Sequence, residues 1–342
     1  MADAAGRPAR RAGRRPTLDD VAAAAGVSRA MVSIVLRGAP GSRPETRERV
    51  LAAAERVGYR PDTRARLLAS GSSRQLGVVL GMSGRFHTEL LDGLYDAAAA
   101  YGYELFLSAL TPRRDERAAV ETLLDLRCEA VILLGSGLGG VPVPAGRLPV
   151  TVVGWRVPDP GVDVVRTSDT AGLRLLVEHL GGLGHRRVAH VDGGPGPIGT
   201  ARRTAFRAAL RRRGLAAGGI VVPGGDSLEA GVRAARELLR LPTLPTAVVG
   251  FNDDVAAGLA EALGAHGIRV PGDVSVTGWD DSSLARLPEQ GLTTLRQDPV
   301  ELARLAVGRS VARLRGEEPQ PREIVLDPEL VVRGSTAPPP AA

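Results

Sequence analysis

The sequence of 342 residues predicts two kinds of structure in one chain: an all-α helix-turn-helix bundle with a hinge helix, followed by a two-lobed α/β domain of two doubly wound parallel sheets. Two observations predict this fold class. Residues 16–60 carry a helical pattern of apolar positions punctuated by glycines, and residues 75–334 alternate short apolar runs with amphipathic segments. The distribution of charge separates the same two regions.

The N-terminal region is predicted to be helical. Residues 1–15 contain mainly Arg, Ala, Gly and Pro without periodicity, so we expect a disordered basic arm. Short helices are expected over 17–26, 28–38 and 44–58, because each begins at a capping residue or a proline and ends at a glycine. The first two are joined through a Gly-Val turn, which is typical of a helix-turn-helix. A hinge helix and linker should follow over 61–74.

The longer C-terminal region is predicted to form two sheets. Apolar runs such as LGVVLG and AVILLG alternate with helical segments such as TELLDGLYDAAAAYG. Runs that are apolar throughout are typical of parallel strands buried on both faces by helices. The alternation is longer than one such sheet needs, so a ligand is expected between two sheets, near the carboxyl ends of their strands. Residues 335–342 (STAPPPAA) are expected to form a disordered tail.

Positive charge is concentrated at the N-terminal end of the chain. The first 75 residues contain 15 Arg and 7 Asp or Glu, a net charge of +8, whereas the remainder contains 29 Arg and 31 Asp or Glu, a net charge of −2. This asymmetry is typical of a nucleic-acid-binding module joined to a neutral domain. The chain contains no lysine, so every basic contact with DNA must come from arginine.

Composition also excludes several classes of site. A single cysteine, Cys128, and five scattered histidines predict no disulfide, no metal and no cofactor, and Cys128 begins an apolar run in which a packed thiol is expected. No apolar run reaches the roughly 20 residues of a membrane helix, and residues 1–15 lack the apolar stretch of a secretory signal. We therefore expect a cytoplasmic protein without membrane contact.

One motif favours an enzyme at first sight. Gly194–Gly199 (GPGPIG) follows an apolar run and matches the dinucleotide fingerprint G-x-G-x-x-G. Two prolines remove backbone donors, however, and residues 200–225 contain no Asp or Glu for a ribose. A loop facing a ligand cleft is the favoured interpretation, and an NAD-type enzyme stays as the weaker alternative. His185 is interpreted as a loop-packing residue.

Several motifs in order resemble one family. TLDDVAAAAGVSRAMVSIVLRG with ETRERVLAAAERVGYRPD, then GLGHRRVAHV, FNDDVAAG and VPGDVSVTGWDD, are similar to the lactose-repressor (LacI/GalR) family of bacterial regulators, from about Thr17 to Val332. The resemblance implies a transcriptional regulator, not an enzyme, with a periplasmic-binding-protein-like domain for effector binding and dimerisation over 75–334.

The resemblance also implies the residues that contact operator DNA. A recognition helix over 28–37 would lie in the major groove, with Arg29 as the leading base reader because arginine can bond guanine bidentately. Leu68 of the hinge helix would wedge between base pairs in the minor groove. Ile34 and Arg37 depart from residues frequent in the family, so the operator sequence does not follow from the resemblance. The implied DNA-binding residues are Thr17, Ser28, Arg29, Ala30, Ser33, Ile34, Arg37, Thr46, Tyr59, Ala65 and Leu68.

A second set of residues is implied for a small-molecule effector. Carboxylates, an amide and a guanidinium are the groups that recognise polyols, so a carbohydrate-like effector is expected. Gly154 stands where sugar-binding members often have aspartate, which puts the usual sugar assignment in doubt. The implied effector-binding residues are Phe86, Arg202, Asp226, Asn252, Asp280 and Gln297.

The prediction for function is therefore a repressor that binds a pseudo-palindromic operator as a homodimer and responds to a small molecule. The residues after Val332 carry no heptad pattern, which favours a dimer over a coiled-coil tetramer. A solute-binding protein of the transport type is the main alternative, and the basic N-terminal region argues against it. Activator against repressor, and inducer against corepressor, stay open.

Overall fold

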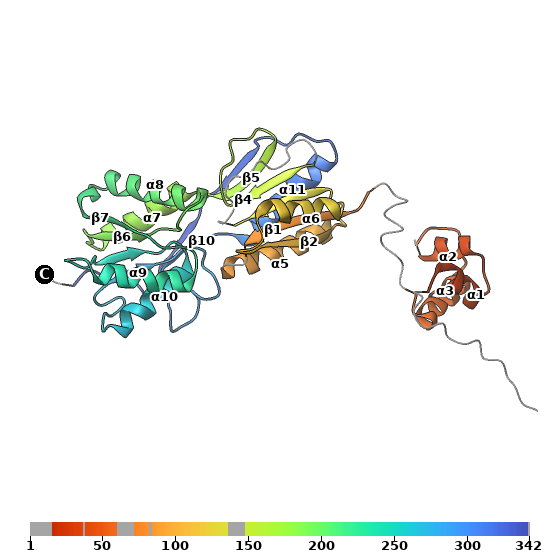
Figure 1. Ribbon diagram of the computed structural model, residues 1–342, viewed down its shortest axis with the longest axis horizontal. Helices are drawn as coiled ribbons and strands as arrows, with labels where there is room; N and C mark the ends of the chain where they lie inside the picture. Colours follow the sequence, from red (N-terminus) through yellow and green to blue (C-terminus); the bar gives the residue numbers. More distant parts are fainter. Residues whose placement is uncertain (1–15, 37, 60–71, 82–83, 136–147, 341–342) are drawn as a thin grey trace, which may run out of the picture. The chain divides into compact units, whose positions relative to one another are not determined.

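The computed structural model describes residues 16–36, 38–59, 72–81, 84–135 and 148–340, which belong to two compact units, residues 1–72 and 73–342 (Figure 1). The expected basic arm and most of the expected hinge helix lie outside the described residues. None of the helices within the described ranges is long and apolar enough to cross a membrane.

The N-terminal unit contains three helices around a small apolar core. They are α1 (Leu18–Ala25), α2 (Arg29–Leu36) and α3 (Pro44–Val57). Val21, Val32 and Val50, one from each helix, are fully buried against one another.

Local hydrogen bonds define the starts of the first two helices. The Asp20 carboxylate accepts hydrogen bonds from the Thr17 N–H and hydroxyl, both at 2.7 Å, and the Ser28 hydroxyl accepts one from the Met31 N–H at 3.2 Å. The predicted helix-turn-helix is present.

The first lobe of the second unit is a parallel sheet covered on both faces. Its strands have the order β11-β5-β4-β3-β1-β2. Because successive residues point to opposite faces, Val78 and Leu80 pack against α5 and α11, whereas Val79 packs toward α6. The elements are β1 (Gln75–Gly81), α5 (Arg85–Ala100), β2 (Glu104–Leu110), α6 (Glu116–Asp125), β3 (Ala130–Leu134), β4 (Val150–Val153), β5 (Val162–Thr167), α11 (Pro299–Leu314) and β11 (Glu323–Leu326).

The second lobe repeats this arrangement with four parallel strands in the order β7-β6-β8-β9. Helices α7 and α8 pack on one face, and α9 and α10 on the other. The predicted pair of doubly wound parallel sheets is confirmed. The elements are α7 (Asp169–Gly182), β6 (Val188–Val191), α8 (Pro197–Arg212), η1 (Ala216–Gly218), β7 (Gly219–Val222), α9 (Leu228–Leu239), β8 (Ala247–Val249), α10 (Asp253–Ala265) and β9 (Ser275–Thr277), with an antiparallel pair, β10 (Thr294–Arg296) and β12 (Glu329–Val331).

The chain passes between the lobes at three short connections. They lie between β5 and α7, between β10 and α11, and between β11 and β12, so each lobe is built from two separate stretches of the chain (Figure 1). The carboxyl ends of β1, β3 and β4 and the loops that follow the strands of the second lobe line a common pocket. The crossings therefore position the site described below.

The C-terminal segment differs from its expectation. Residues 335–340 are not a disordered tail. The Ser335 hydroxyl donates to the Val276 carbonyl at 2.6 Å and accepts from the Thr293 N–H at 2.8 Å, and the Ala337 N–H donates to the Ser275 hydroxyl at 3.0 Å. The physical reason is that β9 is an edge strand, whose unpaired backbone groups this segment covers. Residues 341–342 lie outside the described residues.

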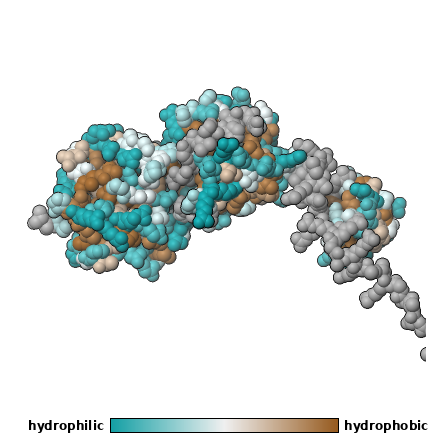
Figure 2. All heavy atoms as spheres, viewed as in Figure 1, coloured by the Kyte–Doolittle hydropathy of each residue, from teal (hydrophilic) through white to brown (hydrophobic). Residues whose placement is uncertain are grey.

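The α/β unit has a mixed surface on one face. On the face shown in Figure 2, hydrophilic residues surround separate apolar patches on the α/β unit.

The only cysteine, Cys128, is buried, and burial raises the pKa of its thiol to about 11, as expected for a packed side chain.

Candidate functional site

One face of α2 is turned away from the core of the N-terminal unit. Ser28, Arg29 and Ala30 are exposed at its start, whereas Val32 and Val35 on the other face are buried. The Arg29 side chain is 67% exposed, and among the described residues it forms an ion pair only with the exposed Asp19, at 3.7 Å. Its guanidinium is therefore free to turn to another acceptor.

The remaining residues expected at DNA divide into three groups. Ser33 and Ile34 are half-buried on α2, and Thr17 and Thr46 are half-buried near the starts of α1 and α3. Tyr59 packs against the core of the bundle, so a structural role is present whatever else it contacts. Arg37, Ala65 and Leu68 lie outside the described residues.

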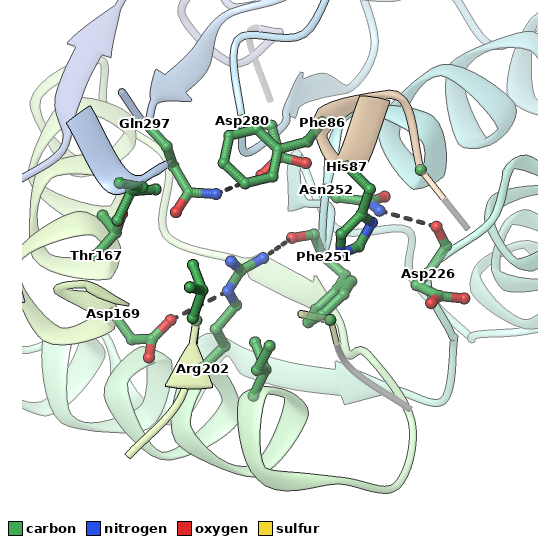
Figure 3. Close-up of a pocket in the computed structure, with 16 residues that line it drawn as sticks. Phe86, His87, Thr167, Asp169, Arg202, Asp226, Phe251, Asn252, Asp280 and Gln297 are labelled. Atoms are coloured by element: carbon green, nitrogen blue, oxygen red, sulfur yellow. Dashed lines mark hydrogen bonds and ion pairs between the residues drawn. The ribbon is translucent and has the colours of Figure 1, made fainter. Parts of the chain in front are cut away.

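The six residues expected at the effector come together in one pocket of the second unit (Figure 3). The space between them is about 650 Å³, with open solvent at its mouth included. They come from six separate points of the chain: Phe86 from the first turn of α5, Arg202 from α8, and the others from loops that follow strands. These are Phe86, Arg202, Asp226, Asn252, Asp280 and Gln297.

Arg202 is the central cation of the pocket. Its Nε lies 3.1 Å from Asp169 Oδ1, its Nη1 donates to the Phe251 carbonyl, and both carboxylate and guanidinium are buried. The guanidinium carbon lies 4.0 Å from the centre of the Trp279 ring and 4.6 Å from that of Phe251. Ion pairing and ring stacking fix its position, and no described residue bonds its Nη2.

Asn252 is held between two backbone groups. It caps α10 by accepting a hydrogen bond from the Val255 N–H at 2.9 Å, and its amide donates to the Asp226 carbonyl at 2.8 Å. The structural role of a helix cap is therefore present together with a place in the pocket. The Asp226 side chain lines the same wall.

Asp280 has a strained backbone and a buried carboxyl group. Its φ is +121°, a region that favours glycine, and it receives a hydrogen bond from Gln297 Nε2 at 2.6 Å. Burial and the nearby charge of Asp253 raise the pKa of Asp280 well above its usual range. Burial likewise raises the pKa of Asp253, which lies behind the pocket, to about 7.

Among the pocket residues that were not predicted from the sequence, two are buried polar residues at the junction of β5 and α7. Asp169, the buried partner of Arg202, follows Ser168, the N-cap of α7. Thr167 is 95% buried and lines the pocket. Its hydroxyl has no hydrogen-bond partner among the described residues. A cap signal in RTSD marks the helix start, but nothing local indicates that these two residues line the pocket.

The GPGPIG loop packs beside this pocket. The Gly194 N–H donates to Asp192 at 3.0 Å, Pro197 begins α8, and Ile198 lines the pocket. A side chain at Gly199 would start 2.5 Å from the Gly194 carbonyl, so this glycine permits a close turn. His185, by contrast, is a packing residue: it hydrogen-bonds Thr246 at 2.9 Å and donates to the Ala337 carbonyl at 2.9 Å.

Two known families match separate parts of the chain. Residues 17–62 match the family described as bacterial regulatory proteins, lacI family, and residues 177–336 match the periplasmic binding protein-like domain. The regulator CelR of Thermobifida fusca is 32% identical over 345 residues, which cover 94% of this chain and 98% of that protein. The repressor CytR of Escherichia coli K12 is 28% identical over 327 residues, 94% of this chain and 96% of its own.

Solved structures agree with these matches. A LacI transcriptional regulator from a Rhodococcus species is 44% identical, with a TM-score of 0.73 over 77% of this chain and 98% of that one. The Lac repressor dimer bound to operator is 27% identical, with a TM-score of 0.82 over 95% of this chain and 100% of that one. A CelR–cellobiose complex is 30% identical, with a TM-score of 0.68 over 94% and 100%.

Proposed function

The chain belongs to the lacI family of bacterial regulatory proteins, and from this premise we propose that it binds a pseudo-palindromic operator as a homodimer and is controlled by a carbohydrate-like effector. The family resemblance seen in the sequence is confirmed. The protein is a DNA-binding transcriptional regulator, and its relatives are regulators rather than enzymes. One observation carries the proposal: in a chain with a lacI-type N-terminal unit, six residues from six places of the second unit line one pocket.

For operator binding, α2 is the element best suited to the major groove. Ser28, Arg29 and Ala30 form an exposed face, and Arg29 brings a guanidinium with the fork geometry that matches guanine O6 and N7. The net charge of +8 over the first 75 residues supplies attraction to phosphates. We propose 16–60 as the DNA-binding domain and 61–74 as the hinge helix and linker, with Ala65 and Leu68 in the minor groove.

For the effector, the pocket offers the groups that hold a neutral polyol. Asp280, Asp226 and Asn252 can accept or donate to hydroxyl groups. The Thr167 hydroxyl, which no other described residue bonds, adds a buried polar atom that a ligand can satisfy. Phe251 and Phe86 provide apolar faces for a sugar ring. The Arg202 charge is balanced by Asp169, so an uncharged ligand suits the pocket better than an anion.

Coupling between effector and operator is proposed to act through the closure of the two lobes. The pocket is lined from both, and direct bonds already join them: Glu89 of α5 accepts hydrogen bonds from the Ser283 N–H and from Arg286, both at 2.9 Å. A ligand that binds one degree of closure better than another shifts that equilibrium. Residues 75–334 are proposed as the effector-binding and dimerisation domain.

The dimer and the location follow from the same reasoning. The Lac repressor was solved as a dimer on its operator, and a two-fold axis matches a pseudo-palindromic site with two α2 helices. A regulator must reach the chromosome, so we place the protein in the cytoplasm. The lacI-type N-terminal unit disfavours the two alternatives, a transport-type solute-binding protein and an NAD-type enzyme.

The test is selection of random duplex DNA by the purified full chain at moderate salt, followed by sequencing. We expect an enriched pseudo-palindrome, and Arg29→Ala should weaken binding of that sequence by the equivalent of about 1–3 kcal/mol and relax one base position in each half-site. Glu48→Ala, at an exposed position of α3, is the matched control. Enrichment of no symmetric sequence contradicts the homodimer, and an unaltered preference in Arg29→Ala removes Arg29 as a base reader.

A further inference from the structure

The beginning of the second unit is held by the carboxylate of Glu129, which directly precedes β3. The two units divide between Ser72 and Ser73. Just after that boundary, Glu129 Oε1 accepts hydrogen bonds from the Ser73 N–H and, at 3.1 Å, from the Arg74 N–H. The Ser73 hydroxyl also donates to the Arg127 carbonyl at 2.6 Å. The end of the linker is therefore bonded to the segment that leads into β3, and these residues form a linker anchor: Ser73, Arg74, Arg127 and Glu129.

The backbone of the linker anchor is held in an unfavourable conformation. Arg74 has a φ of +51° and Arg127 a φ of +61°, a region that favours glycine. Further contacts hold Arg74 there: its carbonyl accepts a hydrogen bond from the Glu104 N–H at 2.9 Å, and its guanidinium carbon lies 5.2 Å from the centre of the Tyr103 ring. Such a conformation persists only where the surrounding structure specifies it. The direction in which the chain enters β1 is therefore fixed by bonds and not by the preference of the residues.

The linker anchor and the effector pocket lie at opposite ends of the same strands. The parallel strands β1, β2 and β3 all begin at the anchor, with Gln75 beside Glu104 and Leu76 beside Ala130. The pocket is lined by Gly84 and Gly135, which follow β1 and β3 at their carboxyl ends. A strand of seven residues such as β1 spans about 20 Å. Because buried strands join the two sites, a movement of the first lobe carries the anchor with it.

We propose that Glu129 is a positioning residue for operator binding: it fixes the point and direction at which the linker leaves the first lobe, and so restricts the spacing of the two half-sites. The proposal rests on the proposed function, since spacing has a meaning only for a dimer on a two-part operator. Without the carboxylate, residues 72–74 join the linker of each protomer and lengthen it by about 10 Å when extended. A longer tether tolerates more spacings and lowers the effective concentration of the second DNA-binding unit at its half-site.

Amide hydrogen exchange of the full chain, followed by mass spectrometry, tests the anchor directly. In Glu129→Ala, the amides of Ser73 and Arg74 should exchange at least about tenfold faster than in the wild type, while protection elsewhere in the unit shows that the variant folds. Glu129→Gln keeps a side-chain oxygen that can accept both bonds and should restore protection. Glu104→Ala removes an exposed carboxylate at the same end of the sheet and is the matched control. Unchanged exchange of both amides in Glu129→Ala overturns the anchor.

Binding to operators of altered spacing tests the consequence. The probe is the sequence enriched by selection, with one base pair inserted or removed between its half-sites. The wild type, Glu129→Gln and Glu104→Ala should lose about tenfold or more in affinity for the altered operators, and Glu129→Ala less than about threefold. Equal losses in the wild type and Glu129→Ala, or a wild type that tolerates every spacing, overturn the inference. If the wild type selects no two-part sequence, the proposed dimer fails, while the exchange measurement still decides the anchor.

Discussion

At the scale of single residues, the pocket depends on a buried ion pair. Arg202 and Asp169 have side chains only 8% and 11% exposed, and they are 33 residues apart in the chain. Burial raises the pKa of Asp169, whereas the charge of Arg202 opposes that rise. Each charge is tolerated in the interior because the other is present, so the two residues must be analysed together.

Removing one charge should therefore destabilise the fold as well as the site. Arg202→Met leaves Asp169 buried without its partner and should lower the free energy of unfolding by about 3–5 kcal/mol. Adding Asp169→Asn should restore part of the stability, because no unpaired charge is left, but not effector binding. Tryptophan fluorescence during urea unfolding reports this unit specifically, since both tryptophans, Trp155 and Trp279, belong to it. Retained effector affinity in Arg202→Met would remove Arg202 from the ligand contacts.

Asp253 should make stability depend on pH. Its carboxylate is almost fully buried and accepts hydrogen bonds from the Ser282 N–H at 2.7 Å and the Thr294 hydroxyl at 2.6 Å. Burial raises its pKa from 3.8 to about 7. The folded state therefore holds the proton more tightly than the unfolded state, and this contribution is complete below about pH 4 and is lost as the pH rises through about 7.

The full difference corresponds to about 4 kcal/mol between these limits. We expect the gap in unfolding free energy between the wild type and Asp253→Asn to shift in favour of the variant between pH 5 and pH 8. Urea titrations followed by tryptophan fluorescence measure that gap, in which the titration of other groups cancels. A gap that does not change with pH means that Asp253 is ionised throughout the range.

The residue scale also marks a limit of sequence reasoning. The six expected effector residues line one pocket. They could be predicted because several separate motifs of one family follow each other in order along the sequence. Asp169 and Thr167 were not predicted, because their place in the pocket depends on how α7 packs on α8 across the lobe. A buried pair that is joined only by tertiary packing leaves no local pattern.

At the scale of elements, most starts and ends could be predicted because local chemistry specifies them. Capping by Thr17 and Ser28, and left-handed glycines at 26 and 58, mark the helices of the N-terminal unit. The C-terminal segment is the exception. STAPPPAA has the composition of a disordered tail, yet its backbone covers the edge strand β9. Composition describes the segment alone and takes no account of the edge it meets.

Truncation after Gly334 should test that role. Loss of Ser335 leaves the Val276 carbonyl and the Thr293 N–H without their partners in a buried place, which costs about 1–3 kcal/mol for each unsatisfied group. The truncated chain should therefore have a lower melting temperature when followed by tryptophan fluorescence. A chain shortened only by residues 341–342 is the control and should melt as the wild type does. Equal melting of both would show that the segment contributes nothing to stability.

At the scale of the whole molecule, charge and polarity are divided between the two units. The first 75 residues carry a net charge of +8 and the rest −2, and the pocket pairs its central arginine with a buried carboxylate. The sequence could predict this division, because counting residues requires no tertiary information.

The same division predicts two different responses to salt. If the arginines of a dimer neutralise about 6–10 phosphates, operator affinity should fall by about 10³- to 10⁵-fold between 50 and 200 mM salt. Effector affinity should change less than about twofold, because an uncharged ligand in a pocket with a balanced ion pair releases no counterions. Fluorescence anisotropy with labelled operator and calorimetry with the effector measure both on one preparation. A steep fall in effector affinity as well would mean that the ligand carries charge, and would contradict an uncharged effector while leaving operator binding intact.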